Sequence, residues 1–121
     1  MDRLKGRSIL VVEDETLIAL DVTRALEEAG CIVIGPVSTV VDAMSRIASV
    51  VIDAAVLDVN LHAEKSLPIM DTLVARNVPF VIVTGYARET LPVQFQGKPF
   101  LGKPFGVMDL VLAVDGAIRP S

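Results

Sequence analysis

The sequence of 121 residues lacks several features that would assign it to large classes of protein. Cys31 is the only cysteine, which excludes an intrachain disulfide and a thiolate metal cage. His62 is the only histidine, so we expect an exposed loop residue there rather than a metal ligand. No cluster of lysines and arginines is present and the formal net charge is −4, which argues against direct nucleic-acid binding. No Gly-rich turn follows the first apolar run, which argues against a dinucleotide or flavin module.

Long hydrophobic runs are also missing, although the composition is apolar. Hydrophobic residues make up 52% of the chain, which is ample for a packed core. Each apolar stretch is short, and none approaches the roughly 20 residues that a membrane-spanning helix needs. The polar start, residues 1–7, argues against a signal peptide. We therefore expect a cytoplasmic protein of one domain that does not enter a membrane.

Short apolar runs alternate along the chain with segments of helical periodicity. Runs rich in β-branched residues predict strands that are buried on both faces, and apolar residues at helical spacing predict helices. The predicted strands are 8–12, 31–34, 54–57, 79–83 and 98–101, with Gly35-Pro36 closing the second. The predicted helices are 14–29, 39–48, 68–76 and 105–118. Pro92 limits any helix in the segment 86–96 to a turn or two.

This alternation predicts an α/β fold with a doubly wound parallel sheet. Parallel strands need crossover connections of about a dozen residues, and helices in those connections cover both faces of the sheet. Five strand-and-helix repeats give a (βα)5 arrangement in three layers, α/β/α. In such sheets the functional crevice lies outside the carboxyl ends of the strands.

Acidic, hydroxyl and basic side chains stand where the predicted strands end. Glu13 and Asp14 follow the first strand, and Asp58 follows the third. Thr84 follows the fourth strand, and Lys103 follows the fifth. Because unpaired carboxylates repel one another in a low dielectric, three acids at one buried edge favour an oxygen-binding divalent cation. We therefore expect the site at this edge of the sheet.

With these residues in this order and spacing, the chain resembles the receiver domain of two-component response regulators, of the stand-alone type. The resemblance covers about residues 8–118 and rests on Glu13-Asp14, Asp58, Thr84 and Lys103-Pro104. It implies a five-stranded flavodoxin-like receiver fold, with residues 1–121 forming one receiver domain. It also implies that Asp58 accepts a phosphoryl group from a histidine kinase or a histidine phosphotransfer protein.

The chemistry of a carboxylate agrees with that assignment. A carboxylate can act as a nucleophile and form an acyl phosphate, and phosphoryl transfer depends mainly on positioning and charge neutralisation. Mg²⁺ suits this task, with carboxylate oxygens of Asp14 and Asp58 as ligands and Glu13 acting through a metal-bound water. By resemblance, the backbone carbonyl of Asn60 completes the protein ligands, and Lys103 places its ammonium beside the phosphoryl oxygens.

The resemblance further implies which residues respond to phosphorylation. The Thr84 hydroxyl would turn toward a phosphoryl oxygen, and Phe100 stands at the position of the family's aromatic switch. Family members usually hold the peptide bond at the position of Pro104 in cis, which aims the lysine. The segment Thr84-Gly85-Tyr86 matches a variant subclass with a Thr-Gly-aromatic sequence, so Tyr86 is a further candidate switch residue.

Ordinary structural roles stay open for the same residues. Asp58 could cap the loop after its strand, Asp14 could cap a helix, and Thr84 could be a plain strand former. The leading hypothesis is a non-enzymatic phosphoacceptor that switches contacts with a downstream protein through a face at about residues 86–118, where a homodimer could also form. The alternative is a constitutive receiver-like scaffold. An aspartyl phosphatase is disfavoured because Asn60 stands where that chemistry needs a second acid.

Overall fold

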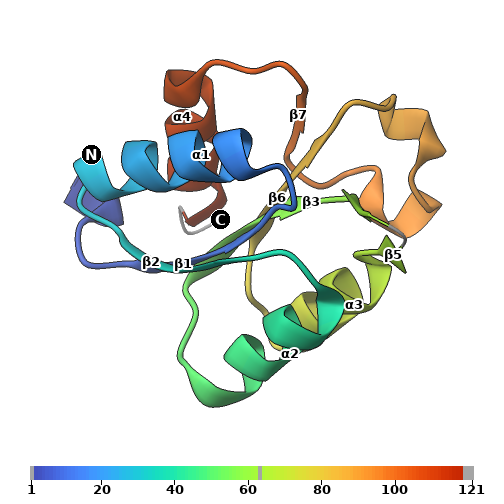
Figure 1. The fold of residues 1–121 in the computed structure, drawn as a ribbon, viewed down its shortest axis with the longest axis horizontal. Coiled ribbons are helices and arrows are strands. Elements are labelled where there is room, and N and C mark those ends of the chain that lie inside the picture. The colour runs from blue at the N-terminus through green and yellow to red at the C-terminus, as the bar shows by residue number, and fades with distance from the viewer. Residues whose placement is uncertain (1, 63, 119–121) are drawn as a thin grey trace.

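Five parallel strands form one sheet at the centre of the molecule (Figure 1). The computed structural model describes residues 2–62 and 64–118, so the ends of the predicted domain at residues 1 and 119–121 lie outside the described residues. In spatial order the strands are β2 (Ile32–Val37), β1 (Ser8–Val12), β3 (Ala54–Asp58), β6 (Phe80–Thr84) and β7 (Phe100–Gly102). The helices are α1 (Thr16–Glu28), α2 (Val40–Ser49), α3 (Leu67–Ala75) and α4 (Val107–Ile118). Most predicted helix ends differ from these by one or two residues.

Helices cover both faces of the sheet, which confirms the doubly wound α/β fold (Figure 1). Alternate residues of β1 enter two separate cores, because successive side chains of a strand point to opposite faces. Ile9 and Val11 pack on the side of α1 and α4, while Leu10 and Val12 pack on the side of α2 and α3. All four are fully buried. Full burial of one such side chain stabilises the fold by about 1.5–3 kcal/mol.

Strand β2 continues through Gly35-Pro36, so the predicted end of this strand at Ile34 was wrong. The register against β1 shifts between Leu10 and Val12, and this irregularity carries the strand past the proline to Val37. Gly35 has a φ of 102°, and a Cβ there would lie 2.8 Å from the backbone nitrogen of Val37. Only glycine fits this bend.

The connection from β6 to β7 contains no α-helix, so residues 2–62 and 64–118 hold four α-helices where five full repeats would give five. Two short 3-10 helices, η2 (Arg88–Thr90) and η3 (Val93–Phe95), take its place. Pro92 lies between them, in agreement with the prediction that it limits helix length here. Leu91 and Phe95 anchor the connection because both are buried in the core shared with α2 and α3.

Two small additions complete the fold. The loop after Asp58 forms a two-stranded antiparallel ribbon, β4 (Asn60–Leu61) and β5 (Glu64–Lys65), and a 3-10 helix, η1 (Asp2–Leu4), precedes β1. Leu4 is fully buried in the core beside α4, and Arg3 forms an ion pair with Asp115 of that helix. Within residues 2–62 and 64–118, no helix combines the length and the apolar character needed to cross a membrane.

Candidate functional site

The charged residues predicted at the strand ends lie together at the carboxyl edge of the sheet. Asp58 is level with Val83 of β6, and Thr84 is level with Gly102 of β7, so the register brings these strand ends side by side. A cavity of about 380 Å³ opens at this edge. Its lining includes Asp14, Asp58, Thr84 and Lys103. The strand pairing therefore positions the site, as expected for a parallel sheet.

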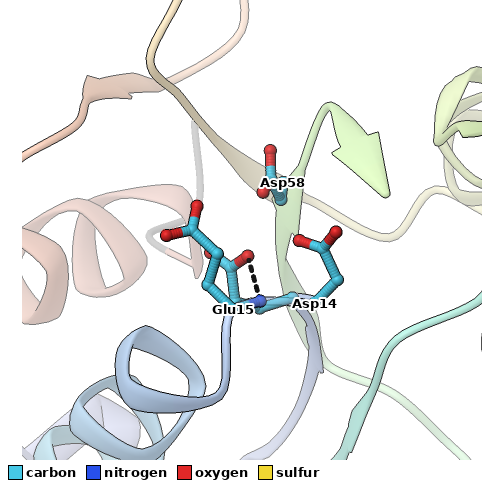
Figure 2. A group of neighbouring side chains, drawn as sticks. Asp14, Glu15 and Asp58 are labelled. Carbon is cyan, nitrogen blue, oxygen red and sulfur yellow. Dashed lines mark hydrogen bonds between the residues drawn. The ribbon is translucent and has the colours of Figure 1, made fainter. Parts of the chain in front are cut away.

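Four carboxylates converge beside this cavity. Glu13, Asp14, Glu15 and Asp58 each offer an oxygen, and these oxygens all lie within 4.8 Å of one another. Figure 2 shows Asp14 and Glu15 on the segment between β1 and α1, with their side chains reaching toward Asp58 at the end of β3. The backbone N–H of Glu15 donates to Glu13 Oε2 at 3.2 Å, which fixes the Glu13 carboxylate (Figure 2).

Glu15 is the member of this cluster that the sequence analysis missed. It continues the acidic run Glu13-Asp14, but at the start of a helical pattern it was counted as part of the helix. In the structure Glu15 is the N-cap residue of α1, and its side chain makes no capping hydrogen bond. The three consecutive acids were the available signal, because one more acid after the pair adds a carboxylate at the same strand end.

Lys103 supplies the positive charge of the site. Its Nζ donates to Glu15 Oε1 at 2.8 Å and to Asp58 Oδ2 at 2.9 Å. Glu13 Oε1 also lies 2.8 Å from Nζ, in an ion pair that lacks the alignment of a hydrogen bond. The Lys103–Pro104 peptide bond is cis, the isomer that the resemblance implies.

The crowding of charges shifts two pKa values in the site. Burial raises the pKa of Glu13 to about 7, and the neighbouring Asp58 carboxylate adds to this, although Lys103 opposes both. Burial disfavours the charged form of Lys103, but the carboxylates of Glu13, Glu15 and Asp58 outweigh it and raise the pKa of Lys103 well above its ordinary value. Lys103 is therefore an ammonium, and Glu13 holds a proton part of the time at neutral pH.

Asp58 and Asp14 are each held by a backbone amide. Asn60 N–H donates to Asp58 Oδ1 at 3.1 Å, and His62 N–H donates to Asp14 Oδ2 at 2.7 Å. The Asn60 side-chain oxygen accepts from Lys65 Nζ across the β4–β5 ribbon. His62 is exposed as expected, but its Nδ1 also lies 3.3 Å from Asp14, a contact that the sequence does not indicate. The loop after β3 thus orients both carboxylates.

The three candidate switch residues lie in different surroundings. Thr84 is buried, and its hydroxyl oxygen accepts from the Tyr86 N–H at 3.1 Å. Tyr86 is exposed and contributes to the lining of the cavity. Phe100 lies on β7, outside the residues that line the cavity, and packs partly buried against the core. The guanidinium of Arg88 lies 4.7 Å from the centre of the Phe100 ring.

The side-chain oxygens of this cluster are suitable ligands for a hard divalent cation. Four acidic side chains share one ammonium, so the cluster keeps a negative charge even when Glu13 is protonated. Every possible metal-ligand atom that these four side chains offer is a carboxylate oxygen, the ligand type that Mg²⁺ prefers over nitrogen and sulfur. Asp14 is the acid of this group that does not contact Lys103 in the described part of the chain, which leaves its carboxylate available beside Asp58.

Comparison with known proteins agrees with the fold. The family model of the response regulator receiver domain matches residues 9–115. The chain therefore belongs to this family, whose members are signalling domains of two-component systems.

The match with this chain covers nearly the whole of some relatives but only part of others. The solution structure of SdrG from Sphingomonas melonis Fr1 is 38% identical with a TM-score of 0.82, and the match covers 96% of this chain and 98% of SdrG. The BeF3-activated conformation of SdrG from Pseudomonas melonis Fr1 is 39% identical with a TM-score of 0.79, over 93% and 96% of the two chains. The transcriptional regulatory protein PdtaR of Mycobacterium tuberculosis is 24% identical over 97% of this chain, which spans 59% of PdtaR.

Proposed function

We propose that this receiver domain accepts a phosphoryl group on Asp58 from a histidine kinase or a histidine phosphotransfer protein. The observation that best supports this proposal is that the Asp58 carboxylate lies beside an open cavity and is held at both of its oxygens. One oxygen pairs with Lys103 Nζ at 2.9 Å, and the other accepts from the Asn60 N–H. The existence of a BeF3-activated conformation of SdrG supports an acceptor site for a compact anionic group.

In the proposed transfer, each residue of the site has a chemical role. A carboxylate oxygen of Asp58 would attack phosphorus, the phosphorus–nitrogen bond of the phosphohistidine would break, and its electron pair would stay on the imidazole nitrogen. Lys103 would stabilise the charge on the phosphoryl oxygens. Mg²⁺, held by Asp14, Asp58 and the backbone carbonyl of Asn60, with Glu13 acting through water, would supply further charge neutralisation.

The response of the domain would start at Thr84. Its hydroxyl now accepts from the Tyr86 N–H, so turning toward a phosphoryl oxygen on Asp58 would change the restraint on the segment after β6. Tyr86 lies in that segment and Phe100 follows it on β7, so both would respond to the change. The surface formed by residues 86–118 is our candidate for binding a downstream protein or a second copy of the chain. The protein would act in the cytoplasm as a signalling switch rather than an enzyme.

Intact-mass measurement with a small phosphodonor tests this function. Wild type, Asp58→Asn and Asp71→Asn would be incubated with acetyl phosphate or phosphoramidate, with and without Mg²⁺. Asp71 is an exposed residue of α3 outside the cavity lining, so its variant is a matched control. We expect a phosphoryl-sized gain that requires Mg²⁺, persists in Asp71→Asn and disappears in Asp58→Asn. No gain from either donor, together with no Mg²⁺ binding, would favour the constitutive scaffold instead.

A further inference from the structure

Lys103 is surrounded by carboxylates before any phosphoryl group arrives. Three carboxylate oxygens, from Glu13, Glu15 and Asp58, lie within 2.9 Å of its Nζ. Glu15 and Asp58 accept two of the three N–H bonds of the ammonium, and the Glu13 oxygen lies at a similar distance in an ion pair, so there is little room for a fourth oxygen beside Nζ. If Lys103 is to contact a phosphoryl oxygen, one of these partners has to give up its place.

The three partners differ strongly in how easily they can leave. The side chains of Glu13 and Asp58 are 3% and 6% exposed, so water cannot easily take the place of the ammonium, and its loss would leave a buried charge unpaired. The Glu15 side chain is 58% exposed. Its carboxylate can be hydrated as soon as it moves away, and exposed ion pairs of this kind are weak.

Glu15 has no competing task in the described part of the chain. Its side chain makes no hydrogen bond at the N-terminus of α1, although it occupies the N-cap position. The hydrogen bond of its side chain goes to Lys103, which lies 88 residues further along the chain. The carboxylate also lines the cavity beside Asp58, so it occupies space next to the proposed acceptor.

We propose that Glu15 is a positioning residue that holds the Lys103 ammonium until the phosphoryl group on Asp58 replaces it. This inference rests on the proposed function. The Glu15 carboxylate acts as an anionic placeholder: it orients Lys103 toward Asp58, and an incoming anionic donor must displace it. Its presence slows phosphorylation by small anionic donors, and its removal frees one donor of Lys103.

Phosphorylation rates of charge-matched variants test the placeholder. Glu15→Gln and Glu27→Gln each remove one negative charge from α1 or its cap, but Glu27 is exposed and lies outside the cavity lining. With acetyl phosphate and saturating Mg²⁺, we expect Glu15→Gln to be phosphorylated about two- to five-fold faster than wild type, because the lost ion pair is exposed. Glu27→Gln should match wild type. An equal acceleration in both variants would overturn the proposal, since net charge alone would explain it.

Magnesium affinity separates the placeholder from a metal ligand. Calorimetric titration should give an Mg²⁺ affinity for Glu15→Gln within about three-fold of wild type, because the exposed Glu15 carboxylate would then act only as a nearby charge that solvent screens. A loss of affinity of about ten-fold or more in Glu15→Gln, with slower phosphorylation, would make Glu15 a ligand and overturn the proposal.

A double-mutant cycle tests the same contact in the absence of phosphorylation. The unfolding midpoints in urea would be measured for wild type, Glu15→Gln, Lys103→Met and the double variant, with Lys103→Gln as a second neutral replacement. We expect non-additive effects, because each single change removes the same ion pair. Additive effects would exclude a coupling between Glu15 and Lys103. This result stands even if Asp58 accepts no phosphoryl group, so failure of the proposed function and failure of the placeholder can be told apart.

Discussion

The loop after β3 and the connection after β6 both border the same cavity, but they are held in place very differently. The loop after β3 is tied on several sides. Its ribbon pairs internally, His62 donates to Asp14, and Glu64 accepts from the first backbone amide of α2. The connection after β6 has no α-helix. We infer that the first region fixes the acceptor and that the second is able to respond.

The connection after β6 has few buried side chains. Arg88 Nη1 donates to the carbonyls of Gln96 and Lys98 at 2.6 and 2.9 Å, and its guanidinium stacks on Phe100. Leu91 and Phe95 provide the buried anchors. Segments with few buried contacts open at lower free energy than core strands, which is where a signalling response is expected.

The largest loss of stability should come from a substitution in the hydrophobic core, on which both regions depend. Leu10 is fully buried between the sheet and the pair α2 and α3, so Leu10→Ala should lower the free energy of unfolding by about 2–5 kcal/mol. Leu17→Ala is the matched control, because Leu17 is 77% exposed on α1 and should cost less than about 1 kcal/mol. Urea unfolding measures both values. Equal losses would contradict the assigned core.

An intermediate effect on stability is expected from Glu13, which lies at the carboxyl edge of the sheet near the loop after β3. The pKa of Glu13 is raised to about 7, so the folded protein keeps a proton that the unfolded chain releases above about pH 4.5. Stability should therefore fall as the pH rises from about 4.5 through 7. Glu13→Gln cannot titrate and should lose this part of the pH dependence.

Urea unfolding in the presence of a chelator, at several pH values between about 5 and 8, would measure this dependence. Glu27→Gln serves as the control and should keep the wild-type slope. If Glu13→Gln and wild type gave parallel profiles, Glu13 would not be the group responsible.

The smallest effect on global stability is expected from the connection after β6. Arg88→Met removes two hydrogen bonds and the stacking on Phe100, but the buried anchors stay. We expect a loss of about 1 kcal/mol or less in global stability, together with faster amide hydrogen exchange confined to about residues 86–102. Arg24→Met on the exposed face of α1 is the control. Faster exchange spread over β1 and β3 would show that the connection is not a separate unit.

Most of the fold could be predicted from the pattern of hydrophobic residues in the sequence. The apolar runs of β1, β3 and β6 could be predicted because parallel strands are buried on both faces, and Asp58, Thr84 and Lys103 follow from where such strands end. The extension of β2 through Gly35-Pro36 could not, because it depends on a register shift against β1. The replacement of a helix by η2 and η3 could be predicted only in part, because Pro92 indicates that a long helix cannot form there but does not indicate which structure takes its place.

The contacts within the site were harder to predict than its location. Glu15 meets Lys103 across 88 residues, and the His62 N–H reaches Asp14 across 48, so neither contact leaves a local pattern in the sequence. Such contacts depend on loop geometry and on side-chain direction, which strand periodicity does not determine.

Phosphorylation and hydrogen exchange, followed on the same sample, test whether Asp58 is the acceptor and whether the connection after β6 responds to it. Wild type and Asp58→Asn would be treated with a phosphodonor and Mg²⁺, the modified peptide located by mass spectrometry, and exchange followed along the chain. We expect a phosphoryl group on the peptide that contains Asp58, with exchange altered in about residues 85–102 and unchanged in β1 and β3. A phosphoryl group elsewhere, or none on wild type while Mg²⁺ binds and a phosphohistidine donor is supplied, would contradict this expectation.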